Sequence, residues 1–92
     1  MKITFSPSFE RDFKKRNPQE KEQVYQVLSR LSEVVGKPHL HGGIGLRKLH
    51  PSGIFEARLG LGLRMVFGFK DNELFLHRLG NHDAIRKYIR NL

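Results

Sequence analysis

The sequence of 92 residues contains no cysteine. This absence excludes disulfide bonds, a zinc site built on cysteine and a thiol nucleophile, and it fits a reducing cytosol. Acidic residues are also scarce, because nine Asp and Glu stand against 17 Lys and Arg, for a formal net charge of +8. No apolar run approaches the roughly 18 residues of a membrane span. Residues 1–5 lack the h-region of a signal peptide, since charge returns at Glu10. We therefore expect a cytoplasmic protein that does not enter a membrane.

The composition, 38% hydrophobic and 28% charged, is typical of a globular domain. A chain of this size buries only about 60–65% of its unfolded surface, so most of the chain must contribute to the core. The sequence has no internal repeat, low-complexity tract or linker, which predicts a single domain over residues 1–92. Its strong positive charge favours a polyanionic partner, either nucleic acid or an acidic protein that covers the same surface.

The N-terminal half predicts one strand and two helices. Residues 3–5 are β-branched and aromatic, as in a strand. Ser6 and Pro7 begin a helix that should stop near Arg16 or Asn17, because the residue before a proline avoids helical geometry. A capping box at residues 17–20 starts the second helix, whose apolar residues recur three and four positions apart up to Gly36. Two helices with such a tight break form an αα-hairpin.

The C-terminal half predicts four strands and a short helix. Apolar residues alternate along 46–50, 54–59, 63–69 and 74–79, with a tight turn at Asp71 and Asn72, and they recur at helical spacing over 84–92. The resulting order, β-α-α-β-β-β-β-α, predicts an α+β fold with the αα-hairpin on one face of a mainly antiparallel sheet. Glu56, Arg58 and Arg64 should then lie on the opposite, less apolar face, which we expect to be open.

Two arginines should face each other on that open face. If their strands are antiparallel neighbours, Arg58 and Arg64 lie across from one another and repel unless an anion joins them. Glu56 would relieve part of this repulsion, and a phosphate would relieve it better, because guanidinium forks match phosphate oxygens. The alternative is a solvated strand face with a Glu–Arg pair. Other basic residues around the sheet are candidates for RNA binding, without base specificity: Lys37, Arg47, Lys48 and Arg78.

Histidine and tyrosine side chains add candidates for proton transfer. His82 follows the last strand, and a histidine side chain can move a proton in catalysis. Alternatively, one of residues 81–83 simply caps the last helix. Tyr88 lies on the apolar stripe of that helix, so it is either a core aromatic or a hydroxyl facing the arginines. His39 and His41 have the spacing of half a metal site, but no carboxylate or cysteine accompanies them, so we expect no metal.

The sequence resembles the RelE/ParE superfamily of bacterial toxin–antitoxin toxins. The matching pieces follow in order nearly from end to end: residues 3–15, 46–49, 54–58, 63–67 and 76–83. The resemblance implies a small α+β toxin that is held inactive by an antitoxin made beside it. Many members cleave mRNA without a metal, often in the ribosomal A site, while others poison DNA gyrase, and the fold alone does not separate these classes.

Individual residues match functional positions of that superfamily. Arg64 matches the strand arginine that contacts the scissile phosphate. His82 stands where nucleases of the family carry an arginine or a histidine, and Tyr88 matches a C-terminal tyrosine that some of them use. Three further residues match recurring positions of less settled role: Glu56, Arg58 and Lys48.

The resemblance implies a mechanism in which the RNA 2′-hydroxyl attacks the adjacent phosphorus. Arg64, with Arg58, would stabilise charge on the phosphate, and His82 would protonate the leaving oxygen. The other proton step is left open among Tyr88, Glu56 and Lys48. We expect no cofactor, and as partners a cognate antitoxin, mRNA and the ribosome, with the free chain a monomer or part of a toxin–antitoxin hetero-oligomer. The alternatives are a gyrase poison without nuclease activity and a basic nucleic-acid-binding module.

Overall fold

A computed structural model of the chain describes residues 2–34, 46–50 and 53–92. Four residues considered above, Gly36, Lys37, His39 and His41, lie outside the described residues. Within them, the elements are β1 (Lys2–Phe5), α1 (Pro7–Lys14), α2 (Pro18–Val34), β2 (Arg47–His50), β3 (Ile54–Leu59), β4 (Leu63–Lys70), β5 (Glu73–Asn81) and α3 (His82–Arg90). The predicted α+β order β-α-α-β-β-β-β-α is confirmed.

Local hydrogen bonds explain where the helices begin. Ser6 Oγ accepts a hydrogen bond from the backbone N–H of Phe9 at 3.0 Å and so caps α1. Asn17 and Glu20 form the predicted capping box, with each side chain accepting from the backbone N–H of the other at 2.8 and 3.3 Å. Asn81 caps α3 by accepting from the N–H of Ala84 at 2.8 Å. The capping role therefore falls to Asn81, and the neighbouring His82 is the first residue of the helix.

The described strands form a mixed sheet in the order β1-β5-β4-β3-β2. β1 runs parallel to β5, and the other neighbouring pairs are antiparallel. Asp71 and Asn72, with φ of 52° and 59°, make the predicted tight turn between β4 and β5. In the β3–β4 pair, Arg58 lies directly opposite Arg64, as predicted.

The core lies between the N-terminal helices and one face of the sheet. Phe9 of α1 and Leu31 of α2 pack with Ala57, Met65 and Phe67 of the sheet, and each of these side chains is at most 1% exposed. Burying such side chains contributes about 1.5–3 kcal/mol for each large one. This contact fixes α1 and α2 on one face and turns the alternate residues of β3 and β4 to the other.

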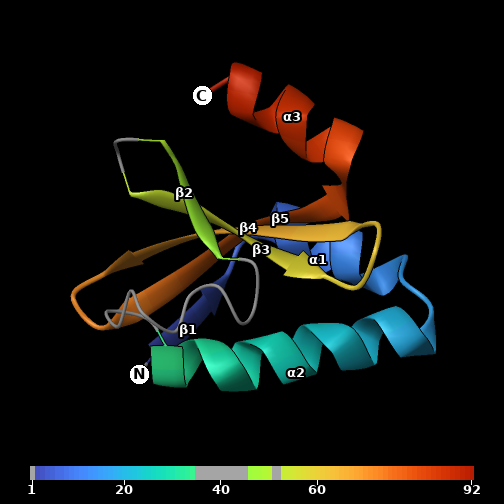
Figure 1. Cartoon of the computed structure of the whole chain (residues 1–92), viewed down its shortest axis with the longest axis horizontal. Coiled ribbons are helices and arrows are strands. Elements are labelled where there is room, and N and C mark those ends of the chain that lie inside the picture. The colour runs from blue at the N-terminus through green and yellow to red at the C-terminus, as the bar shows by residue number, and fades with distance from the viewer. Residues whose placement is uncertain (1, 35–45, 51–52) are drawn as a thin grey trace.

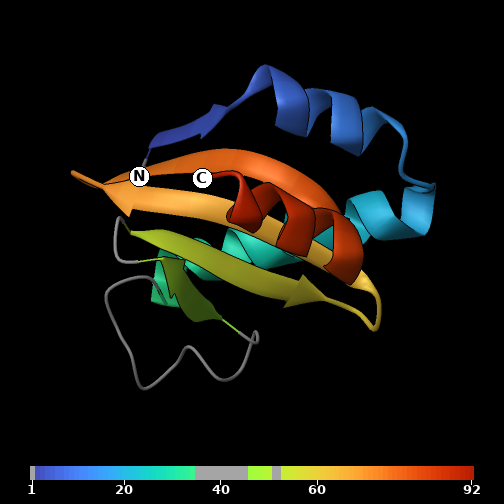
Figure 2. The same ribbon diagram turned by 90° about the horizontal axis from the view of Figure 1, so that it is seen from above.

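The expectation that the second face is open is wrong, because α3 lies on it. α2 runs below the sheet and α3 above it in Figure 1, and the view from above shows α3 over β5 and β4 (Figure 2). Ile85 of α3 is 4% exposed, and a Cβ placed on Gly80 of β5 would lie only 3.2 Å from the Cβ of Ala84. The missing side chain at Gly80 thus lets the helix approach the sheet closely, and the helix covers part of the charged face.

Candidate functional site

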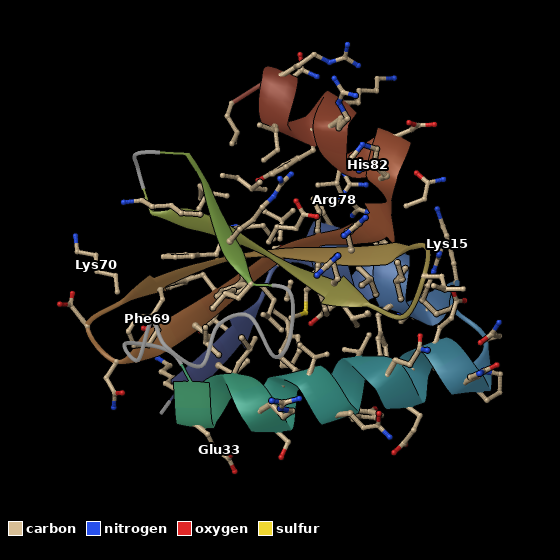
Figure 3. All side chains as sticks on the ribbon, in the orientation of Figure 1. Lys15, Glu33, Phe69, Lys70, Arg78 and His82 are labelled. Carbon is tan, nitrogen blue, oxygen red and sulfur yellow. The ribbon has the colours of Figure 1, made fainter. Side chains whose placement is uncertain are left out.

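A cleft of about 180 Å³ lies between α3 and the strands β2 and β3. We call it the α3 cleft. Figure 3 shows His82 on the side of the sheet that α3 covers. The cleft is lined by Arg47, Leu49, Glu56, His82, Ile85, Arg86, Ile89 and Arg90. It therefore combines a carboxylate, an imidazole and several guanidinium groups above an apolar floor.

Glu56 of β3 is a buried carboxylate in this cleft, with its side chain 6% exposed. Its Oε2 lies 3.4 Å from Nη2 of Arg47 on β2, and its Oε1 lies 3.4 Å from Nη1 of Arg64 on β4. A buried carboxylate is costly unless it is paired, and here two guanidinium groups on neighbouring strands supply the pairing. The Glu–Arg pair that the sequence offered as an alternative is therefore present, between Glu56 and Arg64, and Arg47 extends it across three strands.

Arg64 is the better enclosed of the two facing arginines. Its side chain is 21% exposed, whereas Arg58 is an exposed residue. Within the described part of the chain, the buried Nε of Arg64 has no hydrogen-bond partner, so the ion pair with Glu56 holds the guanidinium. Arg47 and Arg64 thus surround the single negative charge of Glu56, while the exposed Arg58 lies across from Arg64 in the strand register and does not line the cleft.

Arg78 of β5 is engaged with other protein groups. Its Nε and Nη2 donate to the two carboxylate oxygens of Asp12 on α1, at 2.8 and 3.2 Å, and Asp12 Oδ2 also accepts from the backbone N–H of Leu79 at 3.0 Å. The guanidinium carbon lies 5.8 Å from the ring centroid of Tyr88 on α3. The hydrogen bond to Asp12 raises the pKa of Arg78 above its ordinary value, although partial burial opposes this.

The structure brings together some of the sequence candidates and separates others. Glu56, His82 and Arg47 line one cleft, and Arg64 contacts it through Glu56. Tyr88 instead packs against Arg78. Lys48 pairs with Phe55 in the register of β2 and β3, one position from the Arg47–Glu56 pair, so alternation turns it to the other face.

Sequence reasoning missed Asp12 as well as the two arginines Arg86 and Arg90 in the wall of the cleft. Asp12 lies between Phe9 and Phe13 on the apolar face of α1, and a carboxylate there was a signal that it has a buried partner. Arg86 and Arg90 are spaced one helical turn apart, directly after Ile85 and Ile89. The sequence shows this spacing, but it does not show that β2 lies opposite the two arginines.

Two further features lie away from the α3 cleft. A mainly apolar cavity of about 260 Å³ between α1 and α2 has Glu10 and Lys14 as its charged lining residues and contains none of the candidate site residues. His77 of β5 lies where the register of β4 and β5 shifts, and its Nε2 would be 3.2 Å from a Cβ on Gly68. Burial lowers the pKa of His77 from 6.5, which favours the neutral ring.

The fold is shared with solved toxin structures. A copper-bound mutant toxin from Helicobacter pylori superimposes with a TM-score of 0.75 at 26% identity, over 92% of this chain and 98% of that chain. YafQ from E. coli gives 0.72 at 18% identity, over 90% and 94% of the two chains. YoeB in the YoeB–YefM complex from Staphylococcus aureus gives 0.68 at 24% identity, over 89% and 97%. The chain thus has the fold of the RelE/ParE-superfamily toxins, as the sequence resemblance predicted.

No family model matches the sequence, and no curated protein matches it significantly. YafQ and YoeB have also been solved in toxin–antitoxin complexes, with DinJ and YefM respectively. No helix among the described residues is long and apolar enough to cross a membrane.

Proposed function

We propose that this chain is the toxin of a type II toxin–antitoxin system and that it cleaves mRNA as a metal-independent endoribonuclease. The observation that carries the proposal is the α3 cleft, where the buried Glu56 meets Arg64 and where His82 lines the same space. The fold supports a toxin, because the matching structures are toxins and two of them occur in toxin–antitoxin complexes. The partners of this chain are then a cognate antitoxin, mRNA and the ribosome.

The chemistry needs charge stabilisation and two proton transfers. The 2′-oxygen of the RNA attacks the adjacent phosphorus, which forms a 2′,3′-cyclic phosphate and breaks the bond to the 5′-oxygen. Arg64, with Arg58 across from it, stabilises the negative charge on the phosphate oxygens. His82 gives a proton to the leaving 5′-oxygen.

Glu56 is the best-supported group to take the proton of the 2′-hydroxyl. It lines the same cleft as His82, so a phosphate bound in that cleft would have both groups as neighbours. The sequence left Lys48 and Tyr88 as equal candidates. Lys48 lies on the face of β2 opposite to the cleft, and the ring of Tyr88 lies against Arg78, so both are less suited to this step.

Replacing Arg64 by alanine tests the assignment. Removing one preorganised group that stabilises the transition state should reduce the rate of RNA cleavage by about 10²–10³. Lys70→Ala is the matched control, because this exposed cation lies at the end of β4 remote from His82 (Figure 3) and should retain the full rate. Thermal melts of both variants report whether the fold is intact. Full cleavage by a folded Arg64→Ala variant would overturn the role of Arg64.

Primer extension on cellular mRNA after induced expression tests the activity itself. Discrete cuts in phase with codons indicate a nuclease that acts on the ribosome, and cuts without codon phase indicate cleavage of free RNA. Intact messages together with DNA damage contradict a nuclease and indicate a gyrase poison. Co-expression of a cognate antitoxin should abolish the toxicity.

A further inference from the structure

The α3 cleft has a wall that the proposed reaction does not use. Arg86 and Arg90 of α3 face Arg47 of β2 across the cleft and form its cationic rim. Leu49, Ile85 and Ile89 form its apolar floor. We propose that this part of the cleft binds the nucleotide of single-stranded RNA that neighbours the scissile phosphate. Its phosphate lies on Arg86 and Arg90, and its base lies against Leu49 and Ile89. This inference rests on the proposed function and extends it to a substrate-binding subsite.

The apolar floor of the cleft is not completely covered by protein side chains. Ile85 is buried against the sheet, but Ile89, one turn further along α3, and Leu49 on β2 are only half-buried. The cleft of about 180 Å³ lies between them, whereas protein interiors leave few spaces larger than a water molecule. Pockets for drug-sized ligands measure about 300–1,000 Å³, so this cleft, which Glu56 and His82 also line, has room for no more than part of one nucleotide beside the reacting phosphate.

The rim of the cleft carries unbalanced positive charge. Arg86 and Arg90 are four residues apart on one helix face, where like charges destabilise the helix. The ion pairs found among the described residues include neither of them. The acidic residue that lines the cleft, Glu56, is already shared by Arg47 and Arg64. An anion on the rim would therefore relieve the repulsion, and a phosphodiester matches guanidinium groups in bidentate geometry.

The combination of a cationic rim and an apolar floor in the cleft favours RNA over an acidic peptide. Each RNA residue presents a flat ring beside an anion, and unstacked bases of single strands are the parts that proteins usually hold. An acidic side chain instead presents its charge at the end of a flexible stem, which leaves a small apolar recess unfilled. The recess also adjoins Glu56 and His82, so the nucleotide in it is a direct neighbour of the reacting phosphate.

Binding to an uncleavable RNA tests the subsite separately from catalysis. A short, fluorescently labelled single strand with 2′-O-methyl groups throughout lacks the nucleophile, so fluorescence anisotropy reports binding alone. The variants are Arg86→Gln and Arg90→Gln, and the matched control is Lys87→Gln, an exposed cation of the same helix that does not line the cleft. Each arginine variant should lower the slope of log K against log salt by about 0.7, the value for one phosphate contact on a single strand. The control should keep the slope.

The contact between the RNA nucleobase and the apolar floor of the cleft has its own test. An RNA with an abasic site at the subsite position should bind the wild-type chain less tightly, and Ile89→Ala should remove most of that difference. If Arg86→Gln and Arg90→Gln behave like Lys87→Gln, or if they weaken the antitoxin complex but not RNA binding, the proposal is wrong. A chain that shows the predicted binding pattern but cleaves no RNA refutes the nuclease and leaves the subsite standing. If the chain cleaves RNA but Arg86→Gln and Arg90→Gln leave the salt slope unchanged, the subsite is refuted and the nuclease stands.

Discussion

Asparagine in place of Asp12 removes the charge that joins helix α1 to strand β5. The Asp12 side chain is 11% exposed and accepts hydrogen bonds from Arg78 Nε, Arg78 Nη2 and the N–H of Leu79. An asparagine at this position keeps one oxygen, which can still accept from Leu79 and from Arg78 Nε. Its amide NH₂ then faces Arg78 Nη2, so two donors oppose each other there, and the negative charge that balanced the guanidinium is lost.

The expected cost follows from this geometry. Breaking a buried ion pair by removing one partner costs about 3–5 kcal/mol, because the other charge is left buried. The Arg78 side chain is 37% exposed, so water can solvate part of it, and we expect about 2–3 kcal/mol. Domains of this size have about 5–14 kcal/mol of stability, so the variant should still fold. Its Tm should fall by about 8–24 °C, at 4–8 °C per kcal/mol.

Urea unfolding of a double-mutant cycle measures the interaction. The cycle uses Asp12→Asn, Arg78→Gln and the double variant, and the two sites should couple by about 0.5–3 kcal/mol. Glu22→Gln is the control, because it makes the same chemical change at an exposed position of α2 and should alter stability by less than about 0.5 kcal/mol. A loss below about 1 kcal/mol for Asp12→Asn, or additive single effects, would refute the reasoning.

Three smaller perturbations test other parts of the structure. Asn17→Ala removes one half of the α2 capping box and should cost about 1 kcal/mol in urea unfolding; an unchanged midpoint would show that the box contributes nothing. Gly80→Ala places a Cβ 3.2 Å from that of Ala84 and should cost about 1–3 kcal/mol, with faster hydrogen exchange in α3; wild-type exchange would contradict the close approach. Because burial lowers the folded-state pKa of His77 below 6.5, the unfolded chain binds more protons, so stability should fall as pH decreases through about 6.5. His77→Gln should flatten this fall between pH 7.5 and 5.5, and an equally steep fall in the variant would exclude His77 as its source.

The parts of the fold that depend on neighbouring residues were predictable. Caps and turns draw their hydrogen bonds and backbone geometry from residues within a few positions, as the Asn17–Glu20 box and the Asp71–Asn72 turn do. Alternation along two consecutive strands was sufficient to place Arg58 opposite Arg64. The proximity of Glu56 to the two facing arginines therefore follows from the sequence pattern.

The position of α3 was not predictable in the same way. Its periodicity showed that the helix has an apolar face, but not which surface that face would cover. The outcome depends on Gly80, which permits close approach, and on Arg78, which contacts both Tyr88 and Asp12. Because α3 carries Arg86 and Arg90, the second wall of the cleft was invisible to sequence reasoning.

The sequence by itself determined the helices, the strands and the face on which the residues of β3 lie, because short-range hydrogen bonds and the two-residue period of a strand are local properties. Only the tertiary structure decided the pairing of β1 with β5 and the ion pair between Asp12 and Arg78, whose partners are 66 residues apart. It also decided that α3 turns a charged sheet face into a cleft. Such contacts depend on how the whole core packs, and a local pattern does not specify which distant surfaces will meet.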